Sequence, residues 1–134
     1  TSSPPQPSGS SSQFDANGFL QLINEFRSQN GAGPVKLVNA LNEAAVQHNN
    51  YMISINTLTH DRAPGQDIAT MIKQYGGTPG GALGECVAEG ALTTQDVFNS
   101  WKNDGPHAAI MKNPDYTQMG VALNGSYSTA EFSS

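Results

Sequence analysis

The chain has 134 residues and a formal net charge of −5, which comes from six basic and eleven acidic residues. The basic residues form no cluster that could meet phosphates, so nucleic acid is excluded as an expected partner, and binding to an anionic membrane surface gains no support. Charged residues make up only 13% of the sequence and apolar residues 37%, and neutral polar residues fill much of the rest. This balance is typical of a secreted protein.

Length and cysteine content indicate one domain that folds through its own core. A chain of this size amounts to about one domain, and such a domain buries roughly two-thirds of its unfolded surface. Cys86 is the only cysteine, so no disulfide can form within the chain. No stretch approaches the roughly 18 consecutive apolar residues of a spanning helix. We expect a monomer without a transmembrane segment.

The first 13 residues, TSSPPQPSGSSSQ, are rich in serine and proline and contain no hydrophobic anchor. This composition predicts a disordered linker or stalk over residues 1–13. An ordinary disordered terminus explains it equally well. The folded domain is expected to cover residues 14–134.

Three helices are predicted in the first half of the chain. Asp15 is the expected cap of the first, whose apolar residues recur at helical spacing until Asn30 and the following glycine end it. The second begins at Asn39 and buries a stripe of residues three or four apart. The third begins at Pro64 or Gln66 and ends at a glycine-rich run. That run lacks the Lys-Ser/Thr ending of a phosphate-binding loop.

Strands and short helices alternate in the second half. Glu85–Glu89 alternates and is short, as a strand would be. Thr93 or Thr94 is the expected cap of the next helix, which Gly105-Pro106 ends, and residues 107–111 add one helical turn.

A hairpin is predicted at the C-terminal end, with strands over Tyr116–Leu123 and Tyr127–Phe132. Asn124-Gly125 between them favours a type I′ turn, which needs positive φ at both central positions. Asn124 also begins a glycosylation sequon, Asn-Gly-Ser. Helices gathered around such a small sheet predict an α+β domain built in layers.

Four polar residues are candidates for chemistry because each lies in a loop or at the end of an element: His60, Glu85, Asp104 and His107. Two imidazoles and two carboxylates are ligands that zinc or another divalent cation accepts. They are also the groups of an acid/base pair. A third interpretation is a structural or solvated set, which spacing alone favours because the sequence contains no His-Glu-x-x-His motif and no paired cysteines.

Two further polar or reactive residues are interpreted as structural. His48 falls on or beside the apolar stripe of the second helix, where a half-buried histidine is the simpler interpretation. Cys86 has no basic neighbour in sequence that would lower the pKa of its thiol, so we expect a small buried hydrophobe rather than a reactive group.

Taken in order, several segments resemble the CAP domain family (cysteine-rich secretory proteins, antigen 5 and pathogenesis-related 1; also called SCP domains). The resemblance runs from about Phe19 to Phe132. The segments that carry it are Leu22–Arg27 with Gly31–Pro34, Leu41–Met52, Leu58-Thr59-His60, Gly84-Glu85-Cys86-Val87-Ala88, Trp101-Lys102-Asn103-Asp104, Gly105-Pro106-His107 and Met119-Gly120-Val121-Ala122. The fourth resembles the family's Gly-Glu-Asn-Ile/Leu-Ala motif.

The resemblance implies an α-β-α sandwich with a small central, largely antiparallel sheet and a central cleft. It carries His60, Glu85, Asp104 and His107 onto the family's cavity tetrad, which binds zinc or another divalent cation in some members. The chain departs from the pattern where Cys86 replaces the motif's asparagine and where Asp104 replaces a glutamate. It is similar to the disulfide-free microbial type.

The resemblance also guides the expected function. We expect a secreted binding protein with a cation-capable His/Glu/Asp/His cleft that binds a lipid or sterol, or that acts at a host or competitor surface. An enzyme is less expected because no nucleophile has an assigned base. Two alternatives stay open: a metal-dependent hydrolase with Glu85 as general base, and a structural domain associated with a wall or matrix.

Overall fold

A computed structural model describes residues 14–134, so the predicted linker at residues 1–13 lies outside the described residues. The helices are α1 (Ala16–Gln29), α2 (Asn39–Ile55), α3 (Ile68–Gln74), α4 (Thr94–Lys102) and α5 (Gly105–Met111). The strands are β1 (Lys36–Leu37), β2 (Leu83–Glu89), β3 (Gln118–Asn124) and β4 (Tyr127–Ser133).

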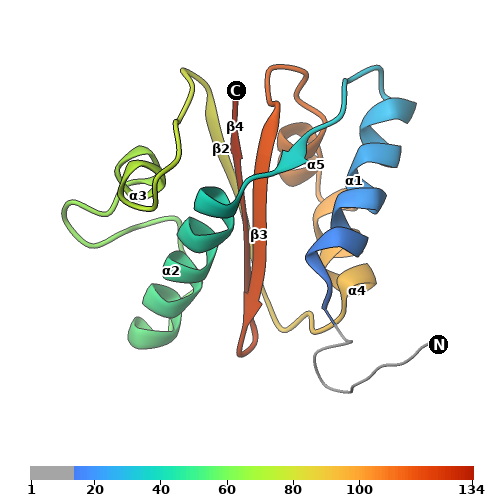
Figure 1. The fold of residues 1–134 in the computed structure, drawn as a ribbon. Helices are drawn as coiled ribbons and strands as arrows, with labels where there is room; N and C mark the ends of the chain where they lie inside the picture. The colour runs from blue at the N-terminus through green and yellow to red at the C-terminus, as the bar shows by residue number, and fades with distance from the viewer. Residues whose placement is uncertain (1–13) are drawn as a thin grey trace.

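The strands form one sheet in the order β1-β3-β4-β2. β4 pairs antiparallel with both β2 and β3, and only the short β1 is parallel to its neighbour. Helices α2 and α3 cover one face of the sheet, and α1, α4 and α5 cover the other (Figure 1). The predicted α+β class and α-β-α sandwich with a largely antiparallel sheet are confirmed.

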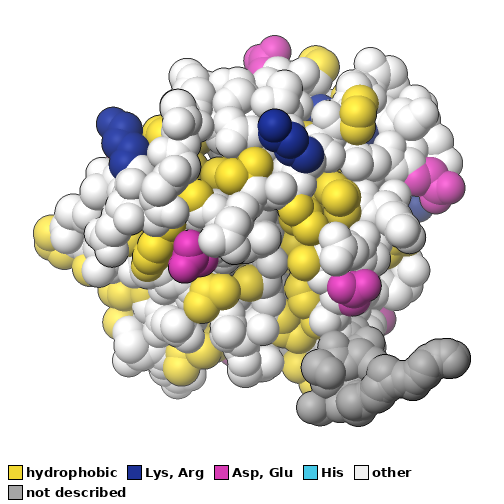
Figure 2. Space-filling view, in the orientation of Figure 1, with side chains coloured by type: hydrophobic (Ala, Val, Ile, Leu, Met, Phe, Trp, Pro, Cys, Tyr) yellow, Lys and Arg dark blue, Asp and Glu magenta, His cyan; other side chains and the backbone are white. Residues whose placement is uncertain are grey.

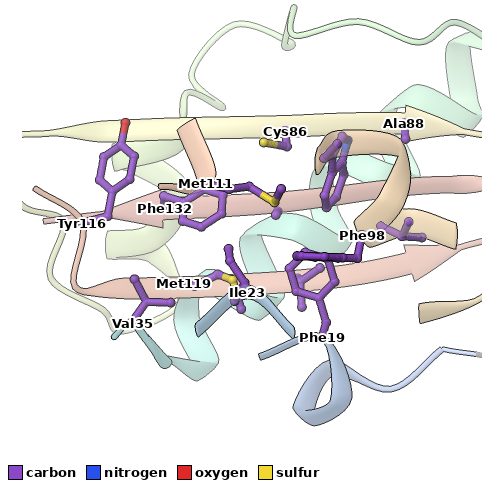
Figure 3. Packing of buried hydrophobic residues seen from close by; sticks show 14 residues of the cluster. Phe19, Ile23, Val35, Cys86, Ala88, Phe98, Met111, Tyr116, Met119 and Phe132 are labelled. Carbon is purple, nitrogen blue, oxygen red and sulfur yellow. The ribbon is translucent and has the colours of Figure 1, made fainter. Parts of the chain in front are cut away.

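The larger part of the core lies between the sheet and helices α1, α4 and α5 (Figure 3). Phe19 packs edge-to-face against Trp101, with ring centroids 5.6 Å apart at 83°. The buried Trp101 indole N–H donates to the Val87 carbonyl at 3.0 Å, so the ring is satisfied as well as packed. This cluster fixes α4 and the start of α5 against β2.

Helix α2 lies along β3 and completes hydrogen bonds that β1 is too short to make. β1 pairs with β3 only at Gln118 and Met119. Beyond that point Asn42 Oδ1 accepts from the Val121 N–H at 2.9 Å, and Asn49 Nδ2 donates to the Ala122 carbonyl at 3.0 Å. The helix therefore covers a strand edge that would otherwise be unpaired.

A buried arginine joins α1 to the segment between α5 and β3. The Arg27 guanidinium donates to the carbonyls of Gly33 at 2.6 Å, Met111 at 2.8 Å, Asn113 at 3.0 Å and Tyr116 at 3.0 Å. Its side chain is fully buried. Because the Arg27 guanidinium donates only to backbone carbonyls here, its role is structural, and it holds these segments together on one face of the sheet.

Several predicted helix boundaries need correction. α3 begins at Ile68, not at Pro64 or Gln66, because the Asp67 side chain caps it by accepting from the Thr70 N–H. α5 spans Gly105–Met111 and is longer than the single turn predicted. Asp104 is its N-cap, and Pro106 lies in the first turn, where its missing N–H costs nothing.

The predicted hairpin forms, but its loop is one residue further along the chain. Asn124 pairs with Tyr127, so the two loop residues are Gly125 and Ser126. Gly125 has φ +59°, and among the described non-glycine residues only Asn56 has positive φ. A positive φ at the first loop position alone fits a type II′ turn, which places glycine there, and not the predicted type I′ turn.

Figure 2 shows few charged side chains on this face of the molecule, and they lie singly among polar and apolar atoms. None of the described helices combines the length and the apolar character that crossing a membrane requires.

Candidate functional site

Two glutamates from neighbouring strands meet beneath α2. Glu85 of β2 lies directly opposite Glu131 of β4 in the antiparallel ladder. Both side chains are buried. Directly opposed side chains in such a pair lie close together, so two carboxyl groups here require a bridging cation or a shared proton.

Arg62, from the loop between α2 and α3, supplies the bridging charge. Its Nη2 contacts Glu85 Oε2 and lies 2.7 Å from Glu131 Oε2, and its Nη1 lies 3.2 Å from Glu85 Oε1. The Arg62 side chain is 11% exposed. The guanidinium thus binds Glu85 through both nitrogens and reaches Glu131 with one, which is a charge-assisted and geometrically specific contact.

The two glutamates have different protonation states. Burial raises the pKa of Glu131 well above its usual range, and the negative charge of Glu85 raises it further. Burial opposes ionisation of Glu85 too, but hydrogen bonds from Arg62 and Glu131, with the Arg62 charge, lower the pKa of Glu85 below its usual value. Glu85 is therefore the partner that ionises first, and Glu131 holds its proton to higher pH.

Two histidines complete the surroundings of Glu85. His60 Nδ1 donates to Glu85 Oε1 at 2.8 Å, and in this tautomer Nε2 is the acceptor nitrogen of the ring. Its side chain is 58% exposed. His48 on α2 donates through Nε2 to the Thr59 carbonyl at 2.8 Å and lies 3.7 Å from Glu85 Oε1. Burial lowers the pKa of His48 despite the nearby Glu85 charge, so its ring is neutral.

A cavity of about 540 Å³ opens beside His60 and Arg62. Its walls come from the loop after α2, the start of α3 and the first residue of β2. The lining residues that give it an apolar side are Ala63, Ile68, Ala69 and Leu83, and those that give it a polar side are His60, Asp61, Arg62 and Asp67. A ligand in this cavity would meet both an apolar wall and the side chain of His60.

Asp104 and His107 form a separate pair. His107 Nδ1 lies 2.7 Å from Asp104 Oδ2, at the start of α5. The His107 carbonyl lies 3.8 Å from Cys86 Sγ, and Cys86 packs in the cluster under α1, α4 and α5. Consecutive side chains of a strand point to opposite faces, so Glu85 faces α2 and Cys86 faces α5. The sheet therefore separates this pair from His60 and Glu85.

The four residues predicted as a cation site thus lie as two pairs, His60 with Glu85 and Asp104 with His107. Within the part of the chain that the structure describes, no group of three or more His, Cys, Asp or Glu side chains is arranged to hold a metal ion. Each pair offers at most two ligands, and Arg62 already neutralises Glu85. Zinc binding by all four residues stays a prediction.

Sequence reasoning missed Arg62 and Glu131. Glu131 carries a signal in hindsight, because it is a charged residue in a strand whose neighbours are small or apolar, and an unpaired charge is rarely buried. Arg62 lies two residues after His60 and carries no comparable signal. Its role depends on how the loop folds back over β2 and β4.

Cys86 is inert, as its surroundings in sequence indicated. Its side chain is fully buried. Burial raises the pKa of the thiol well above its usual value, and the charges of Glu85 and Asp104 add to the effect. A thiol that stays protonated is a poor nucleophile.

Asn124 of the sequon lies at the end of β3, next to the hairpin loop. Its Oδ1 accepts from Asn49 Nδ2 at 2.9 Å. This contact helps to hold the end of β3 against α2, which gives Asn124 a structural role. Glycosylation at Asn124 stays a prediction.

The class of protein is an α-β-α sandwich in which His60, beside a cavity, contacts the buried Glu85 of β2. The profile of the cysteine-rich secretory protein family (CAP) matches residues 20–133, and the chain belongs to this family. With a single cysteine it is of the microbial type that lacks disulfides. The protein YkwD of Bacillus subtilis is 28% identical over 115 residues, which cover 84% of this chain and 44% of YkwD.

Solved structures share the fold. An extracellular protein of Bacillus anthracis that contains an SCP domain superimposes with a TM-score of 0.76 at 20% identity, over 88% of this chain and 41% of that protein. An outer surface protein of Borrelia burgdorferi gives 0.74 at 19% identity, over 87% and 90% of the two chains. A cysteine-rich secretory protein of Staphylococcus aureus gives 0.72 at 18%, over 88% and 37%. The chain spans less than half of YkwD and of the Bacillus anthracis protein.

Proposed function

We propose that this CAP domain acts outside the cell as a binding protein, and that the cavity beside His60 is its binding site. Two of the similar structures are described as an extracellular protein and an outer surface protein, which supports the location. The proposed ligand is a neutral lipid with a small polar head, of which a sterol is the model. It would act by capturing such a lipid at a host or competitor surface.

The composition of the cavity carries this proposal. Its volume of about 540 Å³ falls in the range of small-molecule sites. Ile68 and Leu83 offer an apolar wall to a hydrocarbon body. The free Nε2 of His60 can accept a hydrogen bond from a hydroxyl at the polar side, because Nδ1 is already occupied by Glu85.

The charges at the cavity favour a neutral head over an acidic one. Arg62 is the only basic residue in the lining besides His60, and its guanidinium is already paired with Glu85 and Glu131. Asp61 and Asp67 also line the cavity and would repel a carboxylate. A hydroxyl head meets neither difficulty.

The hydrolase alternative is less well supported by the same geometry. A general base needs a pKa near the working pH and a lone pair free for a proton. The pKa of Glu85 is instead lowered, and its two oxygens are held by Arg62 and His60. Glu85 is thus better suited to hold the loop in place than to activate water.

Divalent cation binding remains part of the proposal as an accessory property. His60 Nε2 offers one ligand at the cavity, and water would have to complete the shell. Calorimetric titration with zinc should give heat with the wild type and less with a variant that carries His60→Ala and His107→Ala. Equal heats would remove the cation from the proposal.

A fluorescent sterol tests the main claim, with binding followed by emission as protein is added. Ile68→Asp should abolish binding, because it places a charge on the apolar wall. His60→Ala should weaken binding about two- to tenfold, the value of one neutral hydrogen bond. Leu92→Ala, at an exposed apolar residue outside the cavity, is the matched control and should bind as the wild type does. No binding by the wild type, or equal binding by all variants, would contradict the proposal.

A further inference from the structure

A second cavity, of about 440 Å³, lies between the outer side of α2 and the end of α3. Its lining residues are Glu43, Val46, Gln47, Asn50, Tyr51 and Tyr75. None of them lines the cavity beside His60. We call this cavity the tyrosine pocket, and the cleft chemistry described above does not use it.

We propose that the tyrosine pocket binds an organic cation, namely an alkylated ammonium group such as that of choline. Two phenol rings and one carboxylate line the pocket together, and no Lys, Arg or His does. The face of an aromatic ring attracts a cation that is too weakly hydrated to prefer water, and a quaternary ammonium is such a cation. The negative charge of the Glu43 carboxylate also attracts a cation.

Two contacts hold the lining in place before a ligand arrives. The Tyr51 ring stacks on the His48 ring, with centroids 6.3 Å apart at 24°. His48 is fully buried, so it fixes the orientation of Tyr51 without competing as a cation. Glu43 Oε2 accepts from Asn39 Nδ2 at 3.1 Å, one turn earlier on α2. A preformed site loses less entropy when it binds.

Gln47 in the pocket lining is held by a hydrogen bond to the loop that precedes α3. Gln47 donates through Nε2 to Gln66 Oε1 at 2.7 Å. Its own Oε1 is buried and has no partner among the described residues.

The charges around the pocket speak against the two other classes of small ligand. An anion would meet Glu43 and no basic side chain in the lining. A purely apolar ligand would leave Glu43, Gln47 and Asn50 facing hydrocarbon, at a desolvation cost that nothing repays. The net charge of the chain, −5, adds a weak long-range attraction for cations.

The experiment is a titration of the isotope-labelled protein followed by amide NMR shifts, with choline as the probe. Its control ligand is 3,3-dimethylbutan-1-ol, which has the shape of choline but a carbon in place of the charged nitrogen. Saturable shifts at α2 and the end of α3 are expected for choline. The neutral alcohol should bind roughly three- to thirty-fold more weakly, the range that cation–π attraction covers. Phosphocholine in a parallel titration distinguishes the two sources of a choline group: binding tighter than that of choline would indicate a lipid headgroup, and weaker binding would indicate free choline.

Two variants connect the shifts to the pocket. Glu43→Gln and Tyr75→Leu should each weaken choline binding several-fold while the spectrum stays that of a folded protein. Glu25→Gln, which removes an exposed carboxylate of α1, is the matched control. No saturable shift with choline, equal binding of the neutral alcohol, or equal binding by Glu43→Gln would overturn the proposal. None of these outcomes bears on sterol binding beside His60, because Glu43 and Tyr75 do not line that cavity.

Discussion

At the scale of single residues, Arg62 does what a bound cation would otherwise have to do. Two carboxyl groups from β2 and β4 are buried side by side, and one guanidinium reaches both. The pair is asymmetric, since Glu85 is ionised and Glu131 keeps its proton. One positive charge therefore balances one negative charge, and the loop that carries His60 and Arg62 is tied to the sheet.

Removal of Arg62 is expected to destabilise the fold strongly. Arg62→Met keeps most of the side-chain volume but leaves a buried carboxylate without its cation, a change that typically costs about 3–5 kcal/mol. Adding Glu85→Gln to the same protein should restore part of the loss, because it removes the unpaired charge. The measurement is urea unfolding. Lys73→Met, at an exposed residue of α3, is the control and should stay within about 0.5 kcal/mol of the wild type. If Arg62→Met lowered the free energy of unfolding no more than Lys73→Met does, this account would be contradicted.

The sequence predicted two of the four residues of this buried cluster, His60 and Glu85, and did not predict Arg62 and Glu131. His60 and Glu85 were identified from their positions at element ends and from the family motif, and the structure places them in contact. Glu131 could not be paired with Glu85 from sequence, because β2 and β4 are far apart in the chain and no tight turn fixes their register. Arg62 in turn could be recognised only once that acidic pair was known.

At the scale of elements, the contact between α2 and β3 depends on one glycine. A Cβ added at Gly120 would collide with the backbone of Leu41 and Asn42. The helix can therefore approach β3 closely enough for Asn42 to accept from the Val121 N–H. Helix α2 also carries His48 and lines the tyrosine pocket, so its distance from the sheet affects both proposed binding sites.

Gly120→Ala should push α2 away from β3 and lower the free energy of unfolding by about 1–3 kcal/mol, the usual cost of overpacking. The loss of the Asn42 hydrogen bond should show as faster hydrogen exchange of the Val121 amide. Gly81→Ala is the matched control, since a Cβ there meets nothing within 4 Å and the backbone is not left-handed. Equal stability of the two variants would show that the helix can shift without cost.

Local sequence signals predicted a helix start correctly where a side chain caps the helix that follows it. Asp15 and Thr93 cap α1 and α4 as expected. The start of α3 was misplaced because Pro64 is a common first helical residue, yet Asp67 caps the helix three residues later. The hairpin loop was misplaced by one residue because Asn-Gly is a strong turn signal in its own right, whereas the register of β3 on β4 selects Gly125-Ser126.

At the scale of the whole molecule, the sheet divides the predicted site. Sequence placed all four candidate residues near the ends of elements, and the family resemblance carried them onto one tetrad. The structure separates them because Asp104 and His107 come from the α4–α5 layer and His60 comes from the layer of α2 and α3. Which face of a sheet a helical layer covers depends on crossover connections, and no local pattern in this sequence reports them.

The buried acid pair gives the whole domain a defined dependence of stability on pH. The pKa of Glu131 is higher in the folded protein than in the unfolded chain, so the folded state binds more protons between the two values. Stability from this group is complete below the unfolded pKa and falls as pH rises toward the folded one. The lowered pKa of Glu85 acts in the opposite sense, and its contribution is lost only as pH falls below the usual glutamate range.

Glu131→Gln isolates the first of these effects, because glutamine resembles the protonated acid and cannot ionise. The variant should match the wild type near pH 4 and become more stable than it as pH rises. Their difference should grow by about 1.4 kcal/mol per pH unit until the folded pKa of Glu131 is reached. Urea unfolding of both proteins from about pH 4 to about pH 8 measures this difference in the free energy of unfolding. Glu85 and His48 titrate in both proteins, so their contributions cancel in the difference as long as glutamine leaves their surroundings unchanged. Parallel stability curves would mean that Glu131 ionises at the same pH in the folded and unfolded chain, and that Arg62 bridges two full charges.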